Sequence, residues 1–365
     1  MLSLRKHINT IFTVLAFVTT TNAYAGLYGF SQMDIAKNIS HDPSLPRHIM
    51  NYRSDMRELI SSVADYGKSK NKNFQILIHE GQYFFDKSLW EYHLKGYNKI
   101  RKSDKLIDDA SFLSNDIPYN HEDKSFSIKR FRSLIDGIVV NNHYCHKSPL
   151  NDIIKDLNIS IFSIEECPSD NDLDNAIAES FKDNIAIYPF LHRDEAFRKI
   201  TRQLIINETA NGIHKVSEAR NISFLINDEK FSTPYQMIDE IRKSNYDIIV
   251  IHPVFHNKTP FTKEEVDMMK FKKNGAPRLI ISLFNISEIS EYSYLWQKRW
   301  NKKLPEWIAD ISPVNPNSYI VKYWFPEWRT LASKYLRSII DTQYDGIFLT
   351  GIENHAYFEQ NTPLE

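Results

Sequence analysis

The chain has 365 residues, and its charges almost cancel: 45 Lys and Arg stand against 46 Asp and Glu, for a formal net charge of -1 at pH 7. A surface so close to neutrality offers no general attraction for nucleic acid, so we expect no nucleic-acid partner. Hydrophobic residues make up 42% of the chain, enough to bury a large core. The aromatic fraction of 13% fits core packing as well as stacking on sugar rings.

The first 25 residues have the form of a cleavable export signal. Arg5 and Lys6 precede an apolar run at 11–18, and Ala23-Tyr24-Ala25 has the small-residue pattern of a signal-peptidase site. We therefore expect cleavage before Gly26. The apolar run is too short to span a bilayer, and no other stretch of the sequence is long enough. The expected product is secreted or periplasmic, with no membrane contact after cleavage.

Short apolar runs alternate with amphipathic segments along the rest of the chain. The runs predict strands at 74–78, 135–140, 159–164, 185–190, 221–226, 247–251, 279–284 and 347–349. Helical spacing predicts helices at 50–68, 150–157, 173–181, 234–244 and 327–342. Asp194 is expected to cap a further helix that runs to about 206, and Thr262 with Glu265 predicts a capping box.

Eight strands separated mostly by helices are typical of a (β/α)8 TIM barrel, an α/β fold. Residues 83–130 show no clear period and are interpreted as an insertion with short helices, which would act as a lid. No low-complexity or glycine-rich linker divides the chain. We therefore expect a single barrel domain over 26–365.

The segment 278–358 carries the most specific pattern. It contains Asn285-Ile286-Ser287-Glu288, Tyr294-Leu295-Trp296, Pro305-Glu306-Trp307, Lys322-Tyr323-Trp324-Phe325-Pro326-Glu327-Trp328 and Asp345-Gly346-Ile347-Phe348-Leu349. These motifs, in this order, resemble the glycoside hydrolases related to endo-α-1,4-polygalactosaminidase, family 114 and its relatives. The family has Ser-Ile-Gly-Glu-Ala-Glu, Tyr-Trp, Pro-Glu-Trp, Val-Lys-Tyr-Trp-Asp-Pro-Glu-Trp and Asp-Gly-Val-Tyr-Leu-Asp at the matching places.

The order of the elements differs from that family. The helix and strand at 50–78 resemble a pair that follows the Leu-Asp strand in the family, whereas here the pair comes first. The resemblance therefore implies a circularly permuted barrel, cut between the family's fourth strand and the helix after it. Two half-barrel domains from an unrelated rearrangement are the alternative.

The resemblance implies hydrolysis of a glycosidic bond in an amino-sugar polysaccharide of the galactosaminogalactan or exopolysaccharide type. Such hydrolysis usually uses two carboxyl groups, one as acid and one as base or nucleophile. Glu288 matches a family acid and is the first candidate, with Glu353 or Glu80 as the second. Glu165 and Glu166 are further candidates, although a carboxylate at a strand end can also simply bind loop amides.

Several departures from the family fall at the strand ends. Thr350 stands where the family has Asp, with Glu353 three residues later, and the acidic positions of other strands have become His252 and Asn141. Either the acids have been redistributed, or the barrel binds polysaccharide without hydrolysing it. The residues expected to bind substrate are His79, Asn141, His252, Tyr323 and Trp324. Trp296, Trp300 and Trp328 are sugar platforms or packing residues.

Histidines give a competing signal. They follow predicted strand ends at His79, His143, His146, His192, His252, His256 and His355. Imidazoles that converge on one barrel mouth could bind zinc, as in a metal-dependent deacetylase. The sequence has no zinc-type spacing such as His-Glu-x-x-His, so we expect no metal or other cofactor.

Cys145 and Cys167 are the two cysteines. Each follows one of two consecutive strands, whose C-terminal ends a right-handed crossover brings to the same face. Export would place the thiols in an oxidising compartment. We therefore expect a disulfide between them, with two free thiols as the alternative.

Overall fold

The computed structural model describes residues 43–102, 126–150, 152–157, 159–192, 197–200, 205–362 and 364. The expected export signal and the middle of the 83–130 insertion lie outside these ranges. Within them, the structure contains no helix with the length and apolarity that a membrane span requires.

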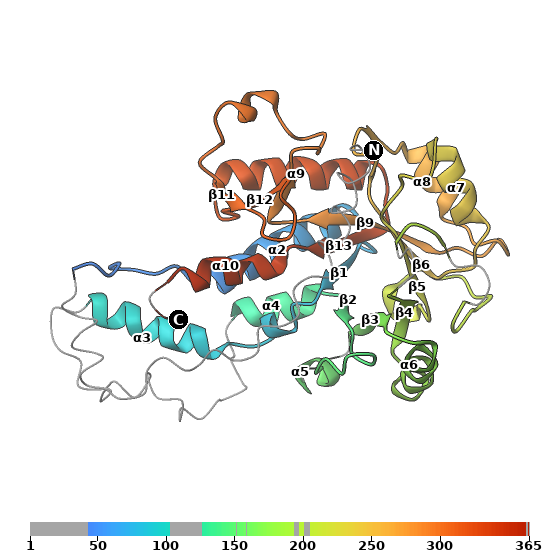
Figure 1. The fold of residues 1–365 in the computed structure, drawn as a ribbon, viewed down its shortest axis with the longest axis horizontal. Helices are drawn as coiled ribbons and strands as arrows, with labels where there is room; N and C mark the ends of the chain where they lie inside the picture. Colours follow the sequence, from blue (N-terminus) through green and yellow to red (C-terminus); the bar gives the residue numbers. More distant parts are fainter. Residues whose placement is uncertain are drawn as a thin grey trace.

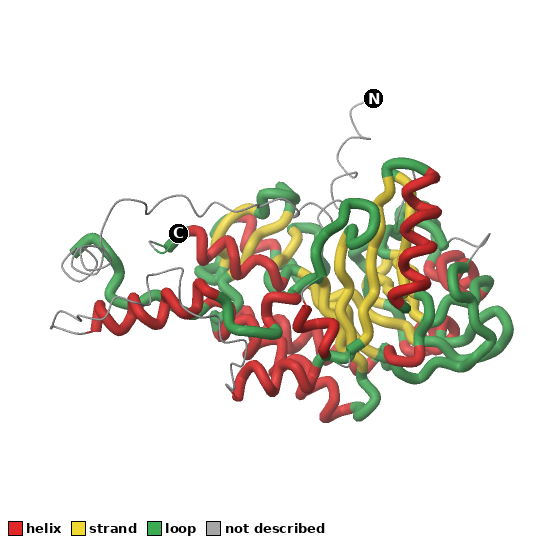
Figure 2. The backbone as a smooth tube through the Cα atoms, turned by 90° about the horizontal axis from the view of Figure 1, so that it is seen from below, coloured by secondary structure: helices red, strands yellow, loops and turns green. Residues whose placement is uncertain are grey.

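The central sheet of the described chain has eight parallel strands in the order β4-β3-β2-β1-β13-β9-β6-β5. They are β1 (Gln75–His79), β2 (Gly137–Asn141), β3 (Ser160–Cys167), β4 (Ala186–Leu191), β5 (Ile222–Leu225), β6 (Ile248–Ile251), β9 (Leu279–Asn285) and β13 (Gly346–Thr350). All eight predicted strands are present, and Figure 2 shows them side by side with helices around them. The fold is an α/β barrel.

The barrel is nearly closed. No ladder of hydrogen bonds joins β4 to β5 in the described chain. The Phe197 backbone fills the gap instead: its amide donates to the Tyr188 hydroxyl on β4, and its carbonyl accepts from the Ile226 amide after β5. The Tyr188 and Phe224 rings meet edge to face, 5.2 Å apart. The predicted helix from Asp194 to 206 is wrong where it is described, because residues 197–200 and 205–206 form turns and irregular backbone.

The pairing of β1 with β13 joins a strand near the start of the described chain to one near its end. Ile76 lies opposite Ile347 and Ile78 opposite Leu349 in parallel register. The strands approach so closely that a Cβ on Gly346 would lie 2.3 Å from the carbonyl oxygen of Gln75. A side chain at this position would therefore push the two strands apart.

Alternate residues of each strand face opposite sides. Leu77, Val139, Phe224 and Phe348 belong to the core inside the barrel, and their neighbours on either side pack against the helices. The inward series ends in polar side chains at the C-terminal mouth. They are His79, Asn141, Glu166, His192, His252, Asn285 and Thr350.

The described helices are α2 (Tyr52–Lys70), α3 (Leu89–Lys102), α4 (Phe126–Leu134), α5 (Asp152–Asp156), α6 (Asp170–Asp183), α7 (Pro234–Arg242), α8 (Lys263–Met269), α9 (Pro326–Asp341) and α10 (His355–Gln360). Short 3-10 turns are η3 (Gln82–Phe84), η5 (Val216–Glu218), η6 (Lys298–Asn301) and η7 (Ile352–Asn354). The predicted capping box at α8 is confirmed, since Thr262 and Glu265 bond reciprocally. Figure 1 shows α2, α9 and α10 grouped around β1, β13 and β9, with α6, α7 and α8 on the other side.

The segment between β9 and α9 contains an antiparallel sheet of β10 (Glu288–Ser290), β12 (Ser318–Val321) and β11 (Ile308–Ile311). A short hairpin of β7 (Val254–Phe255) and β8 (Thr259–Pro260) follows β6. Trp300 contacts both Trp296 and Trp307 edge to face, and Trp307 contacts Trp328. Trp300, Trp307 and Trp328 are buried, so these rings form the core beneath the small sheet.

A disulfide joins Cys145 to Cys167, as the sequence suggested, with the two Cα atoms 5.2 Å apart. It ties the loop after β2 to the end of β3. The buried Glu165 carboxylate strengthens the same junction by accepting hydrogen bonds from the amides of Tyr144 and Cys145. Glu165 therefore has a structural role and is not placed to act on a ligand.

Thiol quantification tests this bridge. The purified protein, denatured without reductant, should contain no free thiol, because both cysteines are joined. Reduction before denaturation should yield two thiols per chain. Two thiols without reductant would contradict the disulfide.

Candidate functional site

Three carboxyl groups meet where β1, β13 and β9 end. Glu80 follows β1, Glu353 lies in η7 after β13, and Glu288 opens β10 after β9. These strands are neighbours in the sheet, so their C-terminal ends lie at one edge. The charges of Glu288 and Glu80 act on Glu353 and raise its pKa, so the three side chains share one electrostatic site. The structure thus brings together the three carboxyls that the sequence suggested for catalysis.

The Glu353 carboxyl is buried, and its pKa is strongly raised. Burial is the largest cause that raises its pKa, and with the charges of Glu288 and Glu80 the value reaches about 7, although its own backbone amide opposes the shift. Its Oε2 atom is buried and finds no hydrogen-bond partner in the part of the chain that is described. A carboxyl in such surroundings keeps its proton near neutral pH.

Glu288 is held differently. Its carboxylate accepts hydrogen bonds from the side chains of Asn354 at 3.1 Å, Ser312 at 3.2 Å and Asn285 at 3.4 Å. Burial raises its pKa above the usual value, and these three donors offset part of that rise. The three side-chain donors favour the charged form of Glu288, whereas Glu353 has its own backbone amide as the donor that opposes the rise in its pKa.

Glu80 adopts a left-handed backbone conformation, with φ of 56°. Its amide donates to the Val139 carbonyl at 2.7 Å, and its Oε1 accepts from the Asn141 amide at 2.8 Å. Burial raises its pKa to about 7, while the bond from Asn141 opposes the shift. Backbone strain of this kind concentrates at functional sites, yet the carboxylate also completes the hydrogen bonding of β2. Glu80 therefore both stabilises the end of β2 and contributes a carboxyl to the site.

A tight turn fixes Glu288 relative to Glu353. Ser287 donates its hydroxyl to the Gly351 carbonyl and accepts from the Asn354 side chain at 2.9 Å. Gly351 has φ of +77°, and a Cβ there would lie 2.2 Å from Oδ1 of Asn285. Only glycine fits, so the turn after β13 and the turn after β9 are locked together.

His79 and Asn141 form a polar pair beside these carboxyls. The Asn141 amide nitrogen lies 2.9 Å from Nε2 of His79, and burial lowers the His79 pKa to about 4. Neutral His79 therefore accepts this bond. Oδ1 of Asn141 is buried and has no partner among the described residues. Both residues remain candidates for ligand contact, as the sequence suggested, with Thr350 next to His79 in the inward-facing layer.

Tyr83 was not anticipated from the sequence. Its ring contacts His355 on α10, with centroids 5.1 Å apart. Burial is the main cause that raises its pKa well above the usual value, and the charges of Glu353 and Glu80 add to the rise. Its sole sequence signal is its position three residues after Glu80.

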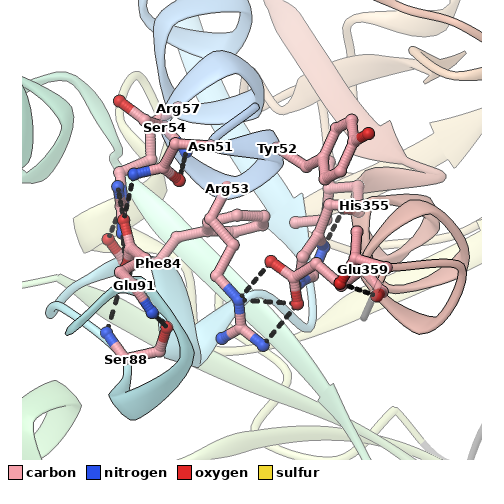
Figure 3. Close-up of polar contacts among 12 residues, drawn as sticks. Asn51, Tyr52, Arg53, Ser54, Arg57, Phe84, Ser88, Glu91, His355 and Glu359 are labelled. Atoms are coloured by element: carbon pink, nitrogen blue, oxygen red, sulfur yellow. Dashed lines mark hydrogen bonds and ion pairs between the residues drawn. The ribbon is translucent and has the colours of Figure 1, made fainter. Parts of the chain in front are cut away.

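Ion pairs on α2 support this side of the mouth. Arg53 holds the buried Glu359 of α10 through two nitrogens, at 2.8 Å and 2.9 Å, and its guanidinium lies over the Tyr83 ring. One turn later, Arg57 holds the buried Glu91 of α3. Figure 3 shows both arginines reaching from α2, one to each carboxylate. The helix therefore fixes α10, and with it the turn that carries Glu353.

Two predicted substrate-binding residues pack against α2: Tyr323 is buried, and Trp324 is half-buried and stays a prediction. Tyr323 is fully buried and donates its hydroxyl to the Tyr52 carbonyl at 2.8 Å, so it cannot meet a ligand. Trp324 packs on Tyr52 and Phe358, with ring centroids 5.3 Å and 4.7 Å away. Both rings pack between α2 and α10 and so help to hold these helices together.

The predicted histidines take separate partners. His252 faces the mouth but bonds the Val254 backbone, and His192 pairs with Glu166 on β3. His256 bonds the Asp228 backbone, and His143 bonds the Ser148 carbonyl. His355 is buried and bonds the Ile352 carbonyl. Within the described ranges, no group of three or more His, Cys, Asp or Glu side chains is arranged to hold a metal ion.

Comparison with known proteins gives relatives whose function is not described. A protein of Methanocaldococcus jannaschii is 31% identical over 176 residues, which is 47% of this chain and 50% of the relative. A Thermotoga maritima protein is 30% identical over 123 residues, and a Deinococcus radiodurans protein 25% identical over 116. The matches span half of the first relative and 37% and 36% of the other two. No family model matches the chain.

Substitution of Gly351 tests the locked turns. Gly351→Ala should destabilise the protein by about 1–3 kcal/mol more than Gly275→Ala. Gly275 is the matched control, because its φ is also positive, at +88°, and no described atom lies within 4 Å of an added Cβ. Urea unfolding of the two variants measures the difference. Equal losses would mean that the turn after β13 has room to relax.

Glu353 also predicts a dependence of stability on pH. Its pKa is about 7 in the folded protein and 4.5 as the ordinary value, so the unfolded chain ionises first as the pH rises. The stability that the protonated group contributes is therefore lost between about pH 4.5 and pH 7. Glu353→Gln should lose less stability than the wild type between pH 4.5 and pH 8. Urea unfolding at both pH values measures this, with exposed Glu264→Gln as control; equal losses in wild type and Glu353→Gln would contradict it.

Proposed function

We propose that this protein is an exported glycoside hydrolase that cleaves an amino-sugar polysaccharide with carboxyl groups at the ends of β1, β9 and β13. One observation carries the proposal: Glu353 and Glu288 share a site but lie in opposite hydrogen-bonding environments. Burial raises the pKa of both carboxyls; two neighbouring charges add to the rise at Glu353, whereas three hydrogen-bond donors offset part of it at Glu288. Pairs of carboxyls whose pKa values are driven apart are the acid and base of such hydrolases.

In the proposed reaction, Glu353 donates its proton to the glycosidic oxygen as the bond from that oxygen to the sugar carbon breaks. Glu288 either removes a proton from the water that attacks this carbon or attacks the carbon itself, after which water releases the sugar. Glu80 is the third carboxyl of the site, held by the Asn141 amide. Its charge raises the pKa of Glu353, which favours the acid form.

The nature of the substrate rests on the resemblance of 278–358 to the polygalactosaminidase-type hydrolases. The matching Glu288 lies within the carboxyl site, which supports the resemblance. The inward-facing layer offers neutral hydrogen-bonding groups beside the acids, namely His79, Asn141, Asn285 and Thr350. Such groups suit the hydroxyl and amide groups of a polysaccharide.

We also propose that the chain is a circular permutation of that family's barrel. The pairing of β1 with β13 supports it, because the first strand of the chain lies where a permutation would put it. The partial matches also support it, since a rearranged order limits any collinear alignment to one block of each chain.

The alternative is a barrel that binds polysaccharide without cleaving it. Thr350 favours this alternative, because a neutral side chain occupies the end of β13 at which the family has an acid. A zinc-dependent deacetylase is a weaker alternative that rests on the histidines alone.

Activity on a partly deacetylated galactosamine polymer tests the proposal. The wild-type protein should release reducing ends, and Glu288→Gln should lower the rate by about 10² to 10⁴ because one carboxyl is lost. Its thermal midpoint should stay close to that of the wild type. Glu291→Gln is the matched control, since Glu291 is exposed and bonds Tyr319 on the small sheet.

Activity retained in Glu288→Gln would place the site elsewhere. A wild-type protein that binds the polymer without releasing reducing ends would favour the binding barrel.

A further inference from the structure

Asn354 is the residue through which the two principal carboxyls are connected. It follows Glu353 directly in the chain, and its side chain is buried, with 5% exposed. Its Nδ2 donates to Glu288 Oε1 at 3.1 Å and to Ser287 Oγ at 2.9 Å. One amide group therefore links the turn after β13 to the turn after β9.

The surrounding contacts leave this amide little freedom. The Ser287 hydroxyl, which accepts a hydrogen bond from Asn354, donates one to the Gly351 carbonyl. The Asn285 side-chain oxygen accepts from the amides of Ser287 and Glu288, at 3.2 Å and 2.9 Å. Asn354 is thus held by groups that themselves belong to the two turns, and its proton is aimed at Glu288.

Two carboxyls placed together cannot both ionise at low cost. The titratable groups that face Glu353 are Glu288 after β9, Glu80 after β1 and Tyr83 in η3. A neighbouring group must therefore favour the ionised form of one of the two carboxyls, Glu288 or Glu353. Asn354 donates to Glu288, and the described chain offers its side chain no bond to Glu353.

We propose that Asn354 is a positioning residue that keeps Glu288 ionised beside a protonated Glu353, and so assigns the roles of base and acid. This inference rests on the proposed function for its catalytic meaning. The assignment itself concerns protons only, and it can be measured without a substrate.

Asn354→Ala removes the donor, so the Glu288 midpoint should rise by about one pH unit, the size expected for one hydrogen bond to a charged group. The gap between the Glu288 and Glu353 midpoints should narrow. Asn354→Asp has nearly the same shape, removes the donor and adds an acid, so it should raise the Glu288 midpoint at least as far. The Asp variant also covers the case in which Asn354→Ala fails to fold.

The measurement is a carbon-13 NMR titration of the protein with labelled glutamate carboxyls, with Glu288→Gln and Glu353→Gln used to assign the two signals. Asn315→Ala is the matched control. Asn315 is buried, with 3% exposed, and bonds Ser318 and Asn317 in the neighbouring turn. A merely structural residue would lower stability without moving the Glu288 midpoint.

A rise of the Glu288 midpoint in the Asn354 variants, with little change in Asn315→Ala, supports the inference. An unchanged Glu288 midpoint in folded Asn354→Ala or Asn354→Asp overturns it. If the midpoint rises but the wild type has no activity on the galactosamine polymer, the proton assignment stands and the proposed hydrolysis fails. If the wild type is active and the midpoint does not move, hydrolysis stands and another group assigns the roles.

Discussion

The parallel pairing of β1 with β13 is the contact on which the rest of the structure depends. It joins a strand near the start of the described chain to one near its end, and Gly346 allows the backbones to approach closely. Since both strands run in the same direction, their C-terminal ends coincide. Glu80 and Glu353 therefore meet, although 273 positions separate them in sequence (353 − 80). Without this pairing the three carboxyls would not share a site.

Buried polar groups lie at both ends of the barrel. Before β6, at the N-terminal end, Asp247 is fully buried, with an ion pair to Lys272 and a hydrogen bond from the Arg220 amide. At the mouth, Glu353 and Asn141 each keep a buried oxygen without a partner in the described chain. Arg278 Nε and the Tyr344 hydroxyl, which lie just before β9 and β13, also lack a partner in the described chain, so unpaired buried atoms occur at both ends.

Much of the fold could be predicted from sequence, because local patterns determine it. Apolar runs that continue over both faces mark parallel strands, and all eight were found. Thr262 and Glu265 signalled a capping box that depends on four consecutive residues. The cysteine pair followed from strand order, since consecutive parallel strands end at the same face.

Other features depend on contacts between distant segments and leave no local trace. Tyr323 resembles a sugar platform in sequence but is buried against Tyr52. Phe197 closes the gap beside β4 where a helix was expected. Within the site, the acids could be named from the resemblance, but the roles of Gly351 and Asn354 follow only from turns brought together by the sheet.

The most direct test of the account is a crystal structure of the Glu288→Gln variant with an oligomer of galactosamine. We expect the oligomer across the ends of β1, β13 and β9, with the Glu353 carboxyl beside a glycosidic oxygen and Asn141 in contact with the sugar. An oligomer bound only over the ends of β3, β4, β5 and β6, away from Glu353 and residue 288, would contradict the account.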